Sequence, residues 1–175
     1  MNKNTIISLG IILVFVAGLV WWSKSVDSTA LGTSGSKSHP ANAGGAVGNA
    51  LTIDKTFYDF GTISMKNGNT SEVFTVSNVS DVDISIKSVV TSCMCTNAFI
   101  LKNDGGKIGP FGMPGHGGAT RVNETIKAGE SVGIEVVYDP NAHGPAGVGT
   151  INRFIEIEDE NGNKLQFEIK ANVTP

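Results

Sequence analysis

The chain has 175 residues with a net charge of −3, 40% hydrophobic and 7% aromatic residues, enough for one ordinary domain plus additional segments. From Ala50 to the C-terminus it carries 10 Lys+Arg and 15 Asp+Glu, a charge of −5. This acidic balance argues against nucleic acid and anionic lipid as ligands of that part, because basic patches bind both.

The first predicted element is an uncharged apolar run, Thr5–Trp22. A helix of this length spans about 27 Å, close to the ~30 Å hydrocarbon core of a bilayer. Lys3 precedes it and favours a cytoplasmic N-terminus. We therefore predict a single-pass membrane anchor over residues 1–22, with the rest of the chain extracytoplasmic. A cleaved secretory signal is the alternative, because residues 28–30, Ser-Thr-Ala, fit a small-x-small cleavage site.

Residues 23–49 are mostly Ser, Gly and Ala with scattered polar residues. Such a segment cannot bury enough apolar surface to fold. It is predicted to be a flexible linker with a root-mean-square reach of about 30 Å.

Residues 50–175 are predicted to form the folded domain, from short runs of alternating apolar and polar residues. Turn signals separate these runs, including Gly61, Asn67-Gly68 and a hairpin at Asn161-Gly162. About seven or eight strands without a helix between them predict an all-β, antiparallel, immunoglobulin-like β-sandwich. The predicted strands are Ala50–Lys55, Ser71–Asn78, Val82–Val90, Ala98–Leu101, Thr125–Ile126, Ser131–Tyr138, Thr150–Glu158 and Lys164–Val173.

The only two cysteines, Cys93 and Cys95, lie one residue apart between two apolar runs. In an extended strand they would project from the same face about 6.6 Å apart. A disulfide requires Cβ atoms about 3.5–4.5 Å apart, so the pair can bridge only if the chain bulges or turns there. Met94 would point to the opposite face, into the core or the solvent.

Three interpretations of this pair compete. In the first, the pair packs or cross-links as an ordinary structural element, since cysteines are among the most buried residues. In the second, it is a thiol-redox site, because the small ring closed by such a bridge would be strained and labile. In the third, it holds a soft metal ion together with Met113 and His116, which lie in the glycine-rich loop that follows. Cys93, Cys95, Met113 and His116 would suit copper as Cu(I), or zinc if the methionine is replaced as a ligand.

Motifs of enzymatic chemistry are missing from the sequence. The glycine-rich loop lacks the Gly-Lys-Ser/Thr of a phosphate-binding loop, and no Gly-x-Ser-x-Gly elbow occurs. His143 is a weaker candidate, because a lone loop histidine is usually only solvated. We therefore expect no enzymatic activity and no cofactor other than a copper or zinc ion.

Five stretches of the chain form a recognisable set: Phe57–Ile63, Val73–Asn78, Ile86–Thr96, Ile126–Glu130 and Val136–Asp139. Together they resemble the bacterial family known as domain of unknown function 1573, over residues 51–173 of the chain. The resemblance implies an immunoglobulin-like sandwich related to Hydin-type and pilus-chaperone-type modules, exported behind a signal or an anchor, and implies no activity. The family typically has Ser-Cys-Gly-Cys-Thr, where this chain has Met94 in place of the glycine. Its Lys102–Asn123 loop is also longer than is usual in the family.

The sequence therefore predicts a non-catalytic binding or scaffold module at the cell membrane, with its β-domain extracytoplasmic. Its expected partners are the membrane, through the N-terminal helix, and proteins or other components of the cell envelope. A soft-metal-binding protein is the alternative function, and a thiol-redox protein is the second alternative.

Overall fold

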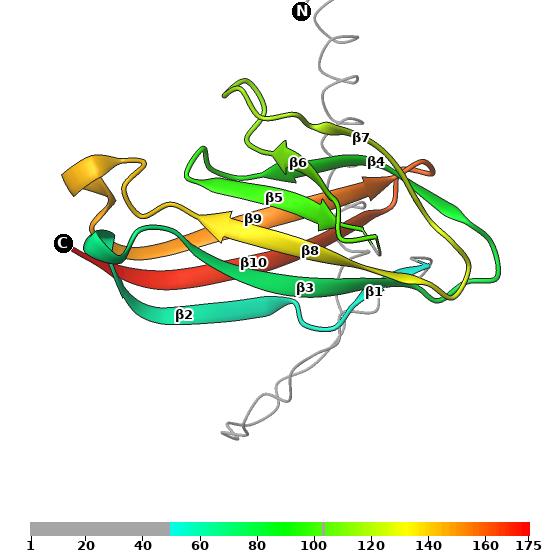
Figure 1. Ribbon diagram of the computed structural model, residues 1–175, viewed down its shortest axis with the longest axis horizontal. Coiled ribbons are helices and arrows are strands. Elements are labelled where there is room, and N and C mark those ends of the chain that lie inside the picture. The colour runs from blue at the N-terminus through cyan, green and yellow to red at the C-terminus, as the bar shows by residue number, and fades with distance from the viewer. Residues whose placement is uncertain (1–49, 103) are drawn as a thin grey trace, which may run out of the picture. The chain divides into compact units, whose positions relative to one another are not determined.

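The computed structural model describes residues 50–102 and 104–175, which form an all-β sandwich of two five-stranded sheets (Figure 1). The predicted sandwich is confirmed. The predicted anchor and linker, residues 1–22 and 23–49, lie outside the described residues. Within the described part of the chain, no helix is both long and apolar enough to cross a membrane.

The first sheet has the strand order β1-β3-β8-β5-β6, and all its neighbours are antiparallel. Tyr138 on β8 lies opposite both Thr70 on β3 and Thr96 on β5, so these three strands meet at one end of the sandwich. The bounds are β1 Leu51–Ile53, β3 Thr70–Asn78, β5 Thr96–Leu101, β6 Lys107–Phe111 and β8 Ser131–Tyr138.

The second sheet has the order β2-β10-β9-β4-β7. Two short 3₁₀ helices, η1 Met65–Asn67 and η2 Gly144–Gly147, are the only helical turns in the described residues. The bounds of the strands are β2 Phe57–Ser64, β4 Ile84–Thr91, β7 Arg121–Ile126, β9 Gly149–Asp159 and β10 Lys164–Thr174.

The prediction of a purely antiparallel sandwich is wrong at one pair of strands. β2 runs parallel to β10, with Phe57 opposite Glu168 and Ser64 opposite Thr174. The three residues 54–56 carry the chain from β1 in one sheet to β2 in the other. The chain therefore joins the second sheet by a crossing between the layers, and no hairpin sets the direction of β2.

Two strands come from stretches that the sequence predicts as turn or loop. Gly61 does not end a strand, because β2 continues through it to Ser64 with Gly61 at φ +68°. β6 lies inside the predicted loop 102–123 and contains Pro110. It is an edge strand, the position in a sheet that tolerates proline because one row of its backbone groups has no strand partner.

The core lies between the sheets and is made by the inward residue of each alternating pair. On β8 these residues are Ile134, Val136 and Tyr138, and on β10 they run from Phe167 to Val173. Phe74 and Phe167 meet across the layers with ring centroids 4.5 Å apart. Burying a side chain of this size contributes about 1.5–3 kcal/mol, so the apolar faces predicted by alternation hold the layers together.

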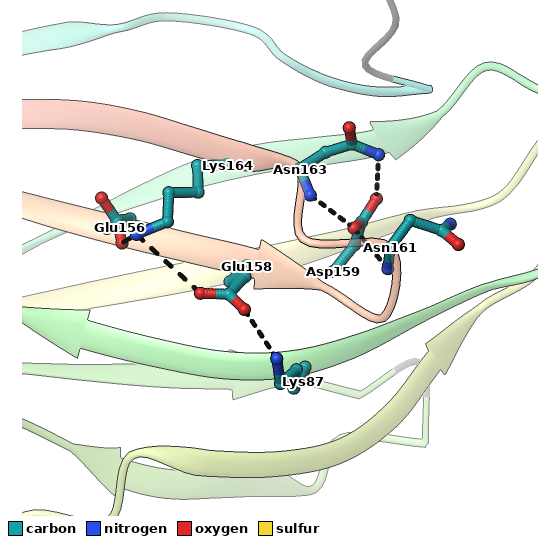
Figure 2. A network of polar contacts seen from close by, with 7 residues as sticks. All are labelled: Lys87, Glu156, Glu158, Asp159, Asn161, Asn163 and Lys164. Carbon is teal, nitrogen blue, oxygen red and sulfur yellow. Dashed lines mark hydrogen bonds and ion pairs between the residues drawn. The ribbon is translucent and has the colours of Figure 1, made fainter.

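The predicted hairpin at Asn161-Gly162 joins β9 to β10 and is closed by one buried carboxylate (Figure 2). Asp159 is 2% exposed. Its Oδ1 accepts hydrogen bonds from the backbone N–H groups of Asn161 and Asn163, both at 2.8 Å, and its Oδ2 accepts one from Asn163 Nδ2 at 2.8 Å. The carboxylate is thus occupied by amide donors, which makes this acidic turn a structural feature and not a cation site.

Candidate functional site

The two cysteines lie in the turn that carries the chain from β4 in one sheet to β5 in the other. The Thr96 N–H donates to the Cys93 carbonyl at 3.1 Å, which closes the turn. The buried hydroxyl Oγ1 of Thr91 lies 3.0 Å from the Cys93 carbonyl oxygen and 2.9 Å from that of Thr96. The strand therefore ends before Cys93, and the extended geometry that would keep the sulfurs apart does not occur.

A disulfide joins Cys93 and Cys95, whose Cα atoms are 5.2 Å apart. A bridge between these two cysteines requires the chain to bulge or turn, and the turn between β4 and β5 meets this requirement. The two sulfurs differ in their surroundings: Cys95 is 0% exposed, whereas Cys93 is only partly buried against the core. Met94, between them in the turn, is 49% exposed.

His143 lies directly beside the bridge. Its Nε2 is 3.2 Å from Cys93 Sγ. The loop after β8 carries it there, because the Asp139 N–H donates to the Cys95 carbonyl at 2.9 Å and ties the end of β8 to the cysteine turn. Figure 1 shows η2, which follows His143, at the same end of the sandwich as the connection from β4 to β5. The Sγ atoms of Cys93 and Cys95 and a ring nitrogen of His143 all lie within 4.8 Å of one another.

Arg153 contacts the other sulfur of the bridge, that of Cys95. Its Nε donates to Cys95 Sγ at 3.2 Å, and its Nη1 donates to the Asn152 carbonyl at 2.8 Å. Among the described residues it has no carboxylate within ion-pair distance, so its positive charge is directed at the sulfur. Burial raises the pKa of Tyr138 on β8 above its ordinary value. The positive charge of Arg153 opposes this effect but is the smaller of the two.

The loop with Met113 and His116 folds back beside the cysteine turn through its backbone. The Thr91 N–H donates to the Gly112 carbonyl at 3.3 Å. Within the loop, the His116 N–H donates to the Met113 carbonyl at 3.1 Å. Met113 is half-buried, whereas the His116 side chain is exposed and does not belong to the group formed by Cys93, Cys95 and His143.

His143, a weak candidate by sequence, and Arg153, which no motif singles out, are thus the two side chains that contact the bridge from distant parts of the chain. His143 is 50 residues from Cys93, and no local pattern indicates that the loop after β8 returns to the cysteines. Arg153 carries a readable signal: it interrupts the inward row Ile151, Ile155 and Ile157 on β9. A charged residue at an inward position needs a polar or ionic partner, and here that partner is a sulfur atom.

The family described as "Protein of unknown function (DUF1573)" matches residues 51–107, which include β1 to β5 and the cysteine turn. The resemblance seen in the sequence is confirmed over this range, whereas the stretches Ile126–Glu130 and Val136–Asp139 lie beyond it. No curated protein sequence matches the chain.

A protein of unknown function from Porphyromonas gingivalis W83 has a similar structure, with TM-score 0.51 and 18% identity. The similarity covers 70% of this chain but only 46% of that protein, so the chain spans less than half of its length. A PapD-like domain of human CEP192 has TM-score 0.46 and 10% identity, covering 85% of this chain and 97% of that domain. The E. coli chaperone DraB has TM-score 0.38 and 11% identity, covering 70% and 54% of the two chains. At 18% identity, the similarity to the Porphyromonas gingivalis protein establishes likeness of fold alone.

Proposed function

We propose that this chain, which matches the DUF1573 family over residues 51–107, is a membrane-tethered, extracytoplasmic binding module without catalytic activity, and that it binds a soft metal ion. The observation that carries the proposal is the meeting of Cys93, Cys95 and His143, whose ligand atoms lie within 4.8 Å of one another. The ligand set of the proposal therefore contains His143 in place of the exposed His116.

The spacing of the three ligand atoms is close to what a single ion requires. A metal about 2.3 Å from sulfur and about 2.0–2.1 Å from an imidazole nitrogen holds the two at most about 4.4 Å apart, so the group, whose atoms lie within 4.8 Å of one another, needs only a small contraction to hold one ion. In the disulfide form the two sulfurs are bonded to each other, so the site forms when the bridge is reduced and they separate around the ion. Two thiolates and an imidazole are the donors that soft ions prefer.

The charge around the site favours Cu(I) over Zn(II). Two thiolates and a monovalent copper ion give a net charge of −1, and the Arg153 guanidinium beside Cys95 Sγ balances it. With a divalent ion the thiolates are already neutralised, and the arginine then leaves an uncompensated positive charge in a half-buried position. Cys95 itself is completely buried, which raises the cost of any such imbalance.

The sequence supports the proposed location of the chain at the membrane. The apolar run Thr5–Trp22 is the tether of the proposal, with a cytoplasmic N-terminus and the sandwich outside the membrane. A disulfide is stable in such an oxidising space and rare in cytosol, which agrees with the Cys93–Cys95 bridge. Protein or cell-envelope partners of the module would be met in the same space.

The test uses the full chain in detergent, reduced and free of oxygen, titrated with Cu(I) against a colorimetric Cu(I) chelator. We expect one ion per chain for the wild type and none for Cys93→Ser/Cys95→Ser. His143→Ala should weaken binding by about tenfold or more, since even an outer-shell partner of a ligand is worth that much. His116→Ala is the matched control and should bind as the wild type does.

Two results would reject the metal proposal. One is a reduced wild-type protein that retains no more copper than the double serine variant. The other is a loss of affinity in His116→Ala with none in His143→Ala, which would restore the ligand set predicted from the sequence.

A further inference from the structure

The Cys93–Cys95 bridge is asymmetric in its access to solvent. Cys95 is completely buried, with Arg153 Nε at 3.2 Å and Thr96 Oγ1 at 3.7 Å from its sulfur. Cys93 is only partly buried, and the group nearest to its sulfur across the fold is the exposed His143. Cys93 is therefore the residue of the bridge that retains exposed surface, and Cys95 has none, so a molecule approaching from solvent meets Cys93 first.

The two sulfurs also differ in how strongly their surroundings would stabilise a thiolate. The Arg153 N–H already points at Cys95 Sγ, and no carboxylate of the described residues competes for this guanidinium at ion-pair distance. A thiolate that forms on Cys95 would receive a charge-assisted hydrogen bond without any rearrangement. The Cys93 sulfur accepts a hydrogen bond from the uncharged backbone N–H of Cys95 at 3.3 Å and lies beside His143, whereas the donor to Cys95 Sγ carries a full positive charge. Cys95 is thus the better leaving group of the bridge, because a sulfur whose thiolate is stabilised leaves faster.

The geometry points to a thiol–disulfide exchange site with a fixed direction, in which Cys93 is attacked and Cys95 leaves. This activity goes beyond the proposed metal site: it uses the same two sulfurs but requires no metal. The reductant is a dithiol, either a small molecule or a protein. The chain acts as a stoichiometric acceptor of two electrons.

The exchange proceeds in two balanced steps. A thiolate of the dithiol forms a bond to Cys93 Sγ, the Cys93–Cys95 bond breaks, and its electron pair leaves on Cys95 Sγ. The second thiolate of the dithiol then attacks its own partner sulfur in the mixed disulfide, and Cys93 leaves as a thiolate. The dithiol is oxidised to a disulfide, the bridge is reduced by the same two electrons, and the two protons lost by the dithiol are taken up by Cys93 and Cys95.

The direction is tested by trapping the mixed disulfide. The full chain, oxidised, metal-free and in detergent, is mixed with glutathione, quenched within its half-time of reduction and alkylated. Fragment-ion mass spectrometry then locates both modifications. We expect glutathione on Cys93 and the alkyl group on Cys95, at least about tenfold more often than the reverse. Glutathione on Cys95, an equal distribution, or a bridge that glutathione does not open would overturn the proposal.

The role of Arg153 is tested by the rate of reduction. Arg153→Met should slow the opening of the bridge by about tenfold, the worth of a charge-assisted hydrogen bond. Arg153→Lys keeps the positive charge and should stay within about threefold of the wild type. Arg121→Met makes the same substitution at an exposed residue on β7 and serves as the matched control, with an unchanged rate expected.

An Arg153→Met protein that reacts at the wild-type rate would remove Arg153 from the mechanism. The trapping experiment requires only the wild-type chain, so the direction of attack can be tested even if that variant does not fold. Because the exchange is measured without metal and Cu(I) is titrated into fully reduced protein, failure of either proposal is distinguishable from failure of the other.

Discussion

At the scale of single residues, Arg153 is the least expected feature of the fold. It lies in a row of inward isoleucines on β9, yet its guanidinium reaches a sulfur atom on the turn between the sheets. An arginine is tolerated at this position because the aliphatic part of its side chain can pack with the core while the charged end contacts polar groups. The guanidinium therefore acts on two groups, on the Cys95 sulfur through a hydrogen bond and on the phenol of Tyr138 through its charge.

The effect of the Arg153 charge can be measured as a change in the pKa of Tyr138. Burial raises the pKa of its phenol, and the positive charge of Arg153 works in the opposite direction because it favours the phenolate. In Arg153→Met we therefore expect the pKa of Tyr138 to rise further, so that the phenolate forms at higher pH. The measurement is a titration of phenolate ultraviolet absorbance in a Tyr58→Phe background, where Tyr138 is the only tyrosine left. A midpoint that stays in place or falls would contradict the position of Arg153.

The bridge itself should stabilise the fold very little. A cross-link that encloses a single residue removes little freedom from the unfolded chain, roughly 1.6 kcal/mol by the entropy of loop closure. We expect the free energy of unfolding in urea to differ by less than about 2 kcal/mol between the oxidised and the fully reduced full chain. A much larger loss on reduction would favour the structural interpretation of the cysteine pair over an exchange or metal site.

At the scale of elements, the β9–β10 hairpin shows how a turn is fixed without any ligand. Asp159 accepts three hydrogen bonds from the turn residues Asn161 and Asn163. Lys87 bonds Glu158 at 2.8 Å and Lys164 bonds Glu156 at 2.7 Å, which adds exposed cross-strand pairs beside it (Figure 2). Pairs of this exposed kind contribute little, so the buried carboxylate carries most of the stability of the turn.

Asp159→Ala is accordingly expected to destabilise the domain by about 3 kcal/mol, because buried amide donors lose a charged acceptor. Glu160→Ala changes the neighbouring acidic residue, which is exposed, and provides the control with an effect within about 0.5 kcal/mol. Urea denaturation of both variants measures the difference. Equal stability of the two would show that the carboxylate is not what holds the hairpin.

The elements also show which parts of the fold local sequence can predict. β8, β9 and β10 were predictable because strict alternation of apolar and polar residues reports directly on a sheet with one buried face. β6 was not, because Gly109 and Pro110 carry turn signals that an edge strand overrides. The cysteine pair could be singled out, but His143 could not be placed beside it, since that contact depends on how two loops far apart in sequence meet.

At the scale of the whole molecule, the proposed tether makes the chain a membrane protein with its site outside. We expect the expressed full chain to sediment with membranes and to be released by detergent but not by high salt. Deletion of residues 1–22 from a chain given a cleavable export signal should move it to the soluble extracytoplasmic fraction. Wild-type protein found in that soluble fraction, with a mass that lacks its first residues, would instead establish the cleaved-signal alternative.

The topology of β3 has one more consequence for such a tethered chain. The chain enters the sandwich at Leu51, which lies opposite Asn78 at one end of β3, whereas Thr70 at the other end lies opposite Tyr138, the neighbour of Thr96. Eight residue steps of strand separate the two ends, about 26 Å. The sandwich is thus bipolar: the chain enters it at one pole, next to Ala50, and its sulfur chemistry occupies the other.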